Sequence, residues 1–373
     1  MAQQHLDPTD PTAEVVTGDA LAAYLRAQAT EFLRALRLHR ETGGTNGAGP
    51  ARAQASAGEK GAEESVDAAR ALRRSARRIS GSLHTFRPLL DADWSEEMRP
   101  ELAWLSGTLG LEHAYEARLE RLLLALHRLS GATAFPGQVV SVDVAAGAAA
   151  ASKAGGPTHP TAPQERGNLT VGAAKAGALL ERQLTLARTR AHSTALQALG
   201  SSRFHAVADK VAVLASEVPL TPTAPTTDLR PLAAAAEERL TDAIAGLPLV
   251  VAGHPYNAEA LVHGLSPDPS PHPQDGPWHQ VRLLLRLHRY AQEALHGGNM
   301  PVDVRLLAAG QALNRHRDAS EAAAAAAQAA RTPRIAPATA YALGVLHADQ
   351  RHEVEAARFA FQQVWQKQTV NAP

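Results

Sequence analysis

The sequence predicts an all-α protein made of two helical-bundle halves. Ala and Leu dominate the composition and aromatic residues make up only 4%, while the Val and Ile residues are too scattered to build a sheet. Apolar residues recur at three- and four-residue spacing through most of the chain, which is typical of amphipathic helices. Two helical segments far apart in the chain also carry the same arrangement of basic residues, which indicates an internal duplication.

The predicted helices are separated by stretches rich in Gly, Pro and polar residues. Residues 42–62 predict a flexible insert and residues 131–168 a low-complexity linker, because neither has apolar periodicity. Pro-rich segments at 219–231 and 264–277 interrupt the helices, since proline removes a backbone donor. We expect helices near 19–41, 65–90, 95–106, 111–129, 170–199, 202–216, 231–246, 278–296, 301–314, 316–331 and 338–367. On this reading the first half spans 14–130 and the second half spans 169–368.

Charge and composition exclude several classes of protein. The 373 residues include 37 Lys plus Arg and 37 Asp plus Glu, so attraction for a polyanion requires a local patch, and a histone-like nucleic-acid binder is not expected. The absence of cysteine excludes disulfide scaffolds, thiolate metal sites and cysteine nucleophiles. The amino terminus lacks a basic start followed by an apolar stretch, and we find no run of about 18 apolar residues. We therefore expect a soluble, cytoplasmic protein without a membrane partner.

Five arginines between residues 70 and 78 take the spacing that normally belongs to the apolar stripe of a helix. The five are Arg70, Arg73, Arg74, Arg77 and Arg78. Asp67 is the only acid between Val66 and Ser80, so pairing within the helix cannot neutralise the five charges. Either acids from elsewhere in the fold pair with these arginines on a solvated face, or they bind an anionic ligand.

The segment WHQVRLLLRLHRYAQEAL at 278–295 repeats this design. One helical face carries His279, Arg282, Arg286, Arg289 and Tyr290. A shift of 209 positions places His279 on Arg70 and Arg286 on Arg77. A weaker echo follows, in which the second copy supplies Arg317 between His316 and Asp318. Arginine presents a planar fork of donors that matches phosphate oxygens, so two such helices facing one another would cradle a phosphate chain.

These helices, with FRPLLD, ELAWLSGTLG and QALNRHRDA, resemble the CHAD family, the conserved-histidine α-helical domain. The resemblance implies two helical-bundle halves related by a pseudo-twofold axis, and a basic central channel that binds inorganic polyphosphate. It also suggests association with polyphosphate granules in the cytoplasm. Carried over to this chain, it places Arg73, Arg77, Arg78, His279, Arg282, Arg286, Arg289, Tyr290 and Arg317 at basic or motif positions.

The chain departs from the family pattern at several positions in its first half. Arg70 replaces the family's first histidine, Ser80 replaces the last arginine of that helix, and His113 with Ala114 replaces an Arg-Asp pair. We find no ExExK strand motif of a triphosphate-tunnel domain, so triphosphatase activity is not expected. Arg70 and Arg74 remain candidate polyphosphate ligands on the spacing argument.

The sequence therefore predicts a non-catalytic protein that binds inorganic polyphosphate, with no cofactor and no metal site. Its 17 histidines include no HExxH and no paired histidines with a carboxylate at helical spacing. Sequence-specific nucleic-acid recognition is not expected, because it requires contacts to base edges, and single-strand binding usually adds stacking aromatics, whereas only Tyr290 lies on either basic face. Two alternatives remain open: a metal-dependent phosphohydrolase, and a helical scaffold whose arginines pair with an acidic protein. No protein partner is indicated.

Overall fold

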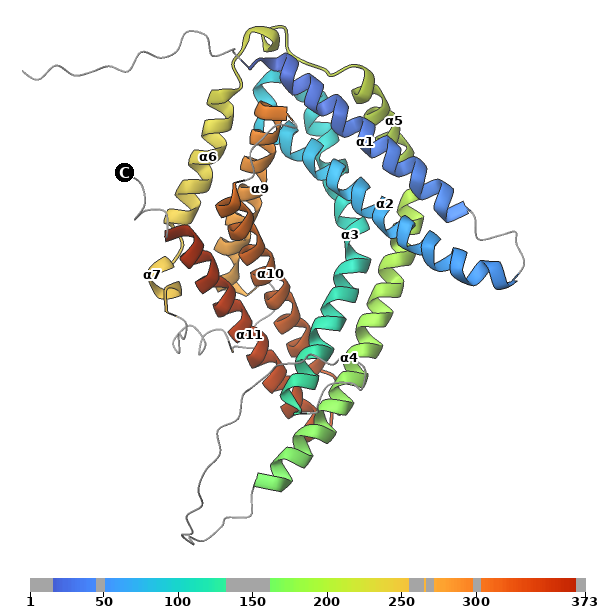
Figure 1. Cartoon of the computed structure of the whole chain (residues 1–373), viewed down its shortest axis with the longest axis vertical. Coiled ribbons are helices and arrows are strands. Elements are labelled where there is room, and N and C mark those ends of the chain that lie inside the picture. Colours follow the sequence, from blue (N-terminus) through green and yellow to red (C-terminus); the bar gives the residue numbers. More distant parts are fainter. Residues whose placement is uncertain are drawn as a thin grey trace, which may run out of the picture. The chain divides into compact units, whose positions relative to one another are not determined.

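The computed structural model describes residues 16–44, 51–131, 162–254, 265, 272–297 and 303–366. Within these ranges the regular secondary structure is helical, apart from two isolated β-bridges (Figure 1). This confirms the all-α class. The helices are α1 (Gly18–Gly44), α2 (Ala51–Thr85), η1 (Arg87–Leu89), α3 (Ala92–Leu129), α4 (Ala162–Leu199), α5 (Ser202–Ser216), η2 (Ala224–Thr226), α6 (Arg230–Ala245), α7 (Leu249–Ala252), η3 (Pro273–Asp275), α9 (Gly276–His296), α10 (Val304–Ala330) and α11 (Pro337–Gln366).

Several helices are longer than the sequence pattern predicts. The stretch expected to be a flexible insert, 42–62, is helical at both ends: α1 continues to Gly44 and α2 begins at Ala51. Ala, Arg, Gln, Glu and Lys dominate this stretch, and their helix propensity sustains a helix without apolar periodicity. Likewise α4 begins at Ala162, inside the predicted linker at 131–168. The rest of that linker, from residue 132 to 161, lies outside the described residues, as do residues 45–50 of the insert.

Two pairs of predicted helices are each one continuous helix. The segments expected near 95–106 and 111–129 form α3, and those near 301–314 and 316–331 form α10. The Pro-rich segment 219–231 does interrupt the helices: it holds η2, and α6 begins only at Arg230. Side-chain caps mark several helix starts. Asp91 Oδ1 accepts from the amide of Trp94 at 2.8 Å before α3, and Ser201 Oγ accepts from that of Phe204 at 3.1 Å in α5.

The residues divide into two compact units, each drawn from three stretches of the chain. Unit 1 comprises residues 1–111, 191–247 and 280–306, and unit 2 comprises the remaining stretches, 112–190, 248–279 and 307–373. The unit boundaries therefore fall inside α3, α4, α9 and α10. They differ from the boundaries expected of two sequence halves, and the internal duplication stays a prediction.

The core of unit 1 is formed by the apolar stripes of α1, α2, α3 and α5. On α2, Leu72, Ile79 and Leu83 are fully buried at the helical spacing that the sequence predicts. They belong to one cluster with Phe32 of α1 and Phe204 of α5. Figure 1 shows α1 and α2 running side by side across this core. The opposite face of α2, which carries the arginines, is thereby turned away from the core.

Two loops of unit 1 are joined by backbone hydrogen bonds. Leu90 and Leu220 form an isolated antiparallel bridge. Next to it, the Asp91 amide donates to the Pro219 carbonyl and the Thr221 amide donates to the Leu89 carbonyl, each at 2.9 Å. The connection from α2 to α3 is thus fixed to the connection from α5 to α6, which sets where α3 starts beside α2.

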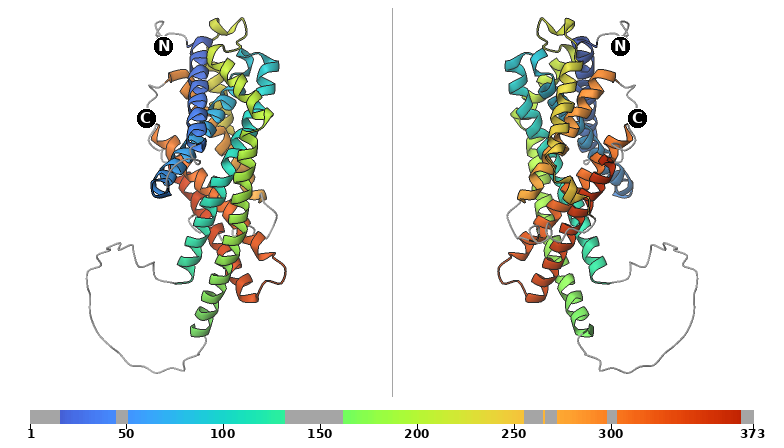
Figure 2. Two further views of the ribbon diagram at one scale, coloured as in Figure 1. Left: turned by 90° about the vertical axis from the view of Figure 1, so that its right-hand side faces the viewer. Right: turned by 90° about the vertical axis from the view of Figure 1, so that its left-hand side faces the viewer.

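Unit 2 has a separate core of Ala and Leu side chains. Leu122 and Leu126 of α3 meet Leu180 of α4, together with Leu343 and Leu346 of α11. Small residues from the alanine-rich stretch of α10 complete this cluster, and they allow the neighbouring helices to approach closely. Figure 2 shows α10 and α11 joined by a short turn. No helix of the described residues is long and apolar enough to cross a membrane.

Candidate functional site

The five arginines of the α2 stripe have different surroundings in unit 1. Arg70 Nη1 lies 3.1 Å from Asp67 Oδ1 on the same helix, and about half of the Arg70 side chain is exposed. Arg73 lies against the backbone of α3 at Gly110. The other three line two separate hollows of unit 1, with Arg77 in one and Arg74 and Arg78 in the other. Three arginines of the predicted stripe are therefore divided between two hollows.

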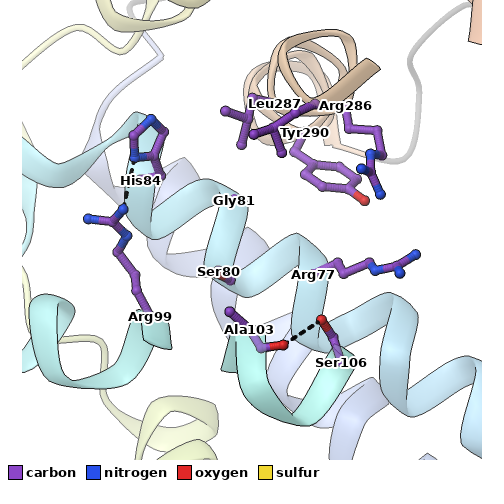
Figure 3. Close-up of a pocket in the computed structure, with 11 residues that line it drawn as sticks. Arg77, Ser80, Gly81, His84, Arg99, Ala103, Ser106, Arg286, Leu287 and Tyr290 are labelled. Atoms are coloured by element: carbon purple, nitrogen blue, oxygen red, sulfur yellow. Dashed lines mark hydrogen bonds between the residues drawn. The ribbon is translucent and has the colours of Figure 1, made fainter. Parts of the chain in front are cut away.

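The first hollow, which we call the α2–α9 pocket, has a volume of about 380 Å³. Arg77 of α2 and Arg286 of α9 both line it, and Figure 3 shows their side chains extending on the same side of the Tyr290 ring (Figure 3). Ser80 of α2 and Ser106 of α3 add hydroxyl groups, and Ser106 donates to the Ala103 carbonyl at 3.2 Å. The repeated pattern in the sequence assigns these two arginines to equivalent positions of the two basic helices.

A third guanidinium reaches this pocket from α3. Arg99 lines it, and Arg99 Nη2 donates to Nδ1 of His84 at 3.1 Å. Burial, followed by the positive charges of Arg99 and two further arginines, lowers the pKa of His84 below its ordinary value. His84 is therefore neutral and acts as an acceptor that holds Arg99. Among the described residues that line this pocket, three carry a guanidinium and none carries a carboxylate.

Sequence reasoning missed Arg99 and His84. Arg99, Ala103 and Ser106 recur at four- and three-residue spacing, so they share one face of α3. That spacing is a usable signal, but it identifies a site only when α3 is known to face α2.

Tyr290 forms part of the pocket wall and is 6% exposed. Its ring passes so close to Gly81 of α2 that a Cβ there would lie 2.6 Å from Tyr290 Cδ2. The guanidinium carbons of Arg78 and Arg289 lie 5.9 and 5.3 Å from the ring centre, within the range of cation–π attraction. Tyr290 therefore packs between two predicted ligands, and the absence of a side chain at Gly81 makes room for it.

The second hollow, the α1–α2 cleft, has a volume of about 1080 Å³ and contains an acidic residue that the sequence analysis did not assign. Glu293 of α9 accepts from Arg78 Nε at 2.7 Å and lies 3.4 Å from Arg289 Nε. It also accepts from the Tyr24 hydroxyl at 3.0 Å. Burial and the charge of Glu293 raise the pKa of Tyr24, so this phenol stays protonated and donates. Glu293 therefore partly neutralises two predicted ligands.

In unit 2, His279 stands beside a buried network of charged groups at the start of α9. Asp275 is fully buried and accepts from Arg351 Nη1 and from Arg358 Nη2, each at 2.7 Å, and from the Ser320 hydroxyl. Glu355 accepts from Arg358 Nη1 at 2.7 Å, which balances the second arginine. Burial alone would raise the pKa of Asp275, but its hydrogen bonds and the arginine charges hold it well below its usual range.

His316 fills the space between this network and His279. Its ring stacks on Trp278 with centroids 5.6 Å apart, and the His279 ring meets it edge-on at 5.4 Å. Nε2 of His316 accepts from Arg358 Nε at 3.3 Å, whereas its distance of 3.6 Å to Asp275 is too long for a hydrogen bond. Burial, with the neighbouring charge of Arg358, lowers the pKa of His316 to about 4. The network thus fixes the first turn of α9, which carries His279.

Arg317, the remaining predicted ligand, also belongs to unit 2. Its Nε donates to Asp318 Oδ1 at 2.9 Å and lies 3.9 Å from Glu321. The described residues of both units contain no group of three His, Asp or Glu side chains placed to hold a metal ion. Of the eleven predicted ligands, unit 1 contains Arg70, Arg73, Arg74, Arg77, Arg78, Arg282, Arg286, Arg289 and Tyr290.

Comparisons with known proteins agree with this architecture. The chain is similar to the solved structure of PptA from Streptomyces chartreusis, with 68% sequence identity and a TM-score of 0.72. The alignment covers 94% of this chain and 99% of that chain. A comparison with curated proteins finds no match. A family model described as the CHAD domain matches residues 47–327, which is more than half of the chain and includes both arginine-bearing helices. The chain therefore belongs to the CHAD family, as its arginine-rich helices predict.

Proposed function

We propose that this protein binds inorganic polyphosphate, with Arg77 and Arg286 of the α2–α9 pocket as its principal ligands. Membership of the CHAD family supports polyphosphate as the ligand. The observation that carries the proposal is the composition of the pocket wall, which has three guanidinium groups and no carboxylate among its described residues. Guanidinium groups bind phosphate oxygens through charge-assisted hydrogen bonds, and a carboxylate at the same place would repel the ligand.

The other predicted ligands extend this surface along α2 and α9. Arg73 and Arg282 belong to the same unit and the same two helices as the pocket. Arg74, Arg78 and Arg289 lie toward the α1–α2 cleft, where Glu293 weakens the positive field. A flexible, uniformly charged chain requires only a series of such cations, because each phosphate unit resembles the next.

Binding without hydrolysis fits the chemistry of the pocket wall. A hydrolytic site needs a base that can take a proton from water. The side chain best placed for that role is His84, but its Nδ1 already accepts a hydrogen bond from Arg99. The hydroxyls of Ser80, Ser106 and Tyr290 have no carboxylate beside them within the described pocket wall. We therefore propose a binding protein that performs no reaction on its ligand, located in the cytoplasm.

Titration of labelled long-chain polyphosphate into the full-length protein tests this function. We expect saturable binding that sulfate at equal ionic strength does not abolish. Arg77→Ala and Arg286→Ala should weaken it, whereas Arg37→Ala should not, because Arg37 is a largely exposed arginine of α1 paired with Glu41. If chloride at the same ionic strength displaced the polyphosphate completely, that result would contradict the proposal and favour the scaffold alternative. Release of orthophosphate in Mg²⁺ or Mn²⁺, lost in Arg77→Ala, would instead favour the phosphohydrolase.

A further inference from the structure

Gly110 of α3 lies directly beneath the guanidinium group of Arg73 in unit 1. A Cβ atom built at Gly110 would lie 2.5 Å from both Cζ and Nη2 of Arg73 and 2.7 Å from its Nε. Three atoms of one planar group at nearly equal distances from a point place that point over the plane of the group. The guanidinium therefore lies flat on the α3 backbone, at a place that only glycine leaves open.

The surroundings of Arg73 restrict its guanidinium group to this position. Gly110 is buried, Arg73 is half-buried, and the Nε atom of Arg73 is shielded from solvent. The long arginine side chain otherwise has many rotamers, and confinement against α3 removes most of them before a ligand arrives. A ligand that meets a fixed guanidinium does not have to order it, so such preorganisation strengthens binding.

We propose that Gly110 is a positioning residue, which holds Arg73 in place for the phosphate chain by providing a surface without a side chain. The inference rests on the proposed function and names a part of its machinery outside both arginine stripes. Glycine lowers the stability of a helix interior relative to alanine. On this proposal, Gly110 makes α3 less stable but allows Arg73 to lie where it can bind phosphate.

The effect of an alanine at position 110 depends on which atoms its methyl group would meet. The atoms that the new methyl group would meet form the far end of a flexible side chain. Arg73 can turn away from them without any movement of the backbone. Gly110→Ala should therefore fold normally and displace only the guanidinium. At Gly81 the corresponding neighbour is the buried Tyr290 ring, so alanine there would disturb the packing itself.

Gly107 provides a matched control on the same helix. It lies one turn before Gly110, it is exposed, and a Cβ built on it meets no atom within 4 Å. Both Gly107→Ala and Gly110→Ala replace an interior glycine of α3 with a better helix former. They should raise the thermal midpoint by similar amounts, and only the second should affect Arg73.

The test compares long-chain polyphosphate binding by the wild type, Gly107→Ala, Gly110→Ala, Arg73→Ala and the double variant Arg73→Ala with Gly110→Ala. We expect Gly107→Ala to bind as the wild type does, and Gly110→Ala to lose roughly tenfold in affinity, like Arg73→Ala. The double variant should bind like Arg73→Ala alone, because the two residues act as one unit. The slope of log K against log salt should decrease by about one phosphate contact in Gly110→Ala.

The outcomes separate this inference from the proposed function. If the wild type does not bind polyphosphate, the function itself fails and the inference with it. If the wild type binds and Arg73→Ala weakens binding, but Gly110→Ala matches Gly107→Ala, the positioning role alone is wrong. An additional loss in the double variant, or a Gly110→Ala protein that fails to fold even with Arg73→Ala, would also overturn it, because Gly110 would then act on something other than Arg73.

Discussion

Glu293 holds the guanidinium of Arg78 through two contacts, with Nε at 2.7 Å from Oε2 and Nη2 at 3.3 Å from Oε1. The two residues are 215 positions apart in the sequence and meet at the α1–α2 cleft of unit 1. On the proposed function, this carboxylate would compete with a phosphate chain for the same cation and limit how much of the α2 stripe contributes to binding.

Replacing this competitor should strengthen binding. Glu293→Gln keeps the shape of the side chain but releases the charges of Arg78 and Arg289. A partly exposed ion pair contributes up to about 1 kcal/mol, so we expect the affinity for long-chain polyphosphate to rise by about fivefold. Binding isotherms at one salt concentration measure the effect. Glu31→Gln is the control, since Glu31 lines the same cleft but pairs with Arg34. An equal gain in Glu31→Gln would show that only net charge matters.

Removing either principal arginine of the α2–α9 pocket should weaken binding without unfolding the protein. We expect a loss of about 1.5 to 3 kcal/mol for Arg77→Ala and for Arg286→Ala, the range for hydrogen bonds to charged groups. The combined variant should lose less than the sum if both contact the same phosphates. Calorimetric titration measures the losses, and circular dichroism checks the helices. A similar loss in Arg37→Ala would indicate diffuse attraction in place of a site.

Salt should weaken binding steeply. If about six phosphates are neutralised, the affinity should fall by roughly a thousandfold between 50 and 200 mM salt, by analogy with counterion release from nucleic acids. Titrations across this range measure the slope of log K against log salt. A flat response would contradict an arginine-lined binding surface.

Acid should destabilise unit 2 through His316. The pKa of His316 is about 4 in the folded protein and 6.5 in an unperturbed histidine. The free energy of unfolding is therefore highest above about pH 6.5. It falls as the pH drops toward 4, because the His316 side chain takes up a proton in the unfolded chain and not in the folded one. The shift corresponds to about 3 kcal/mol at most. Urea unfolding at pH 7.5, 6 and 5 measures this loss.

His316→Gln should flatten part of that pH dependence. A residual slope is expected, because burial also lowers the pKa values of His84 and His288. A variant that kept the complete slope of the wild type would show that another group titrates and that His316 is neutral for a different reason.

The sequence predicted those features of the fold that depend on the residues of a single helix. The apolar spacing of Leu72, Ile79 and Leu83 placed the arginines on the opposite side of α2, and the structure buries all three leucine and isoleucine side chains. The repeated pattern indicated Arg77 and Arg286 as equivalent candidates on two helices, but not that both line one pocket. Apolar periodicity does not indicate the α-helical start at Ala51, because helix propensity alone can sustain a helix without an apolar stripe.

Features that depend on which helices meet were not predictable from the sequence. Glu293 reaches Arg78 and Gly110 underlies Arg73 only because α9 and α3 pack beside α2. Arg99 shares a face with Ala103 and Ser106, but nothing in the spacing indicates that this face meets Gly81. Asp275 precedes α9 in a Pro-rich segment, and its partners Arg351 and Arg358 lie 76 and 83 positions away.

Because unit 1 is built from three separate stretches of the chain, its helices can only assemble in a fixed order during synthesis. Its three stretches end at residues 111, 247 and 306. While the ribosome is still translating the region between them, α2 has already emerged, yet α5 and α9 have not. The apolar stripe of α2 then has only α1 and the start of α3 to cover it, and contacts between residues so distant in the chain form slowly. A nascent chain that stops before Gly276 therefore has the arginines of α2 but no α9 to complete their pocket, so on the proposed function it would acquire the ability to bind polyphosphate late in translation.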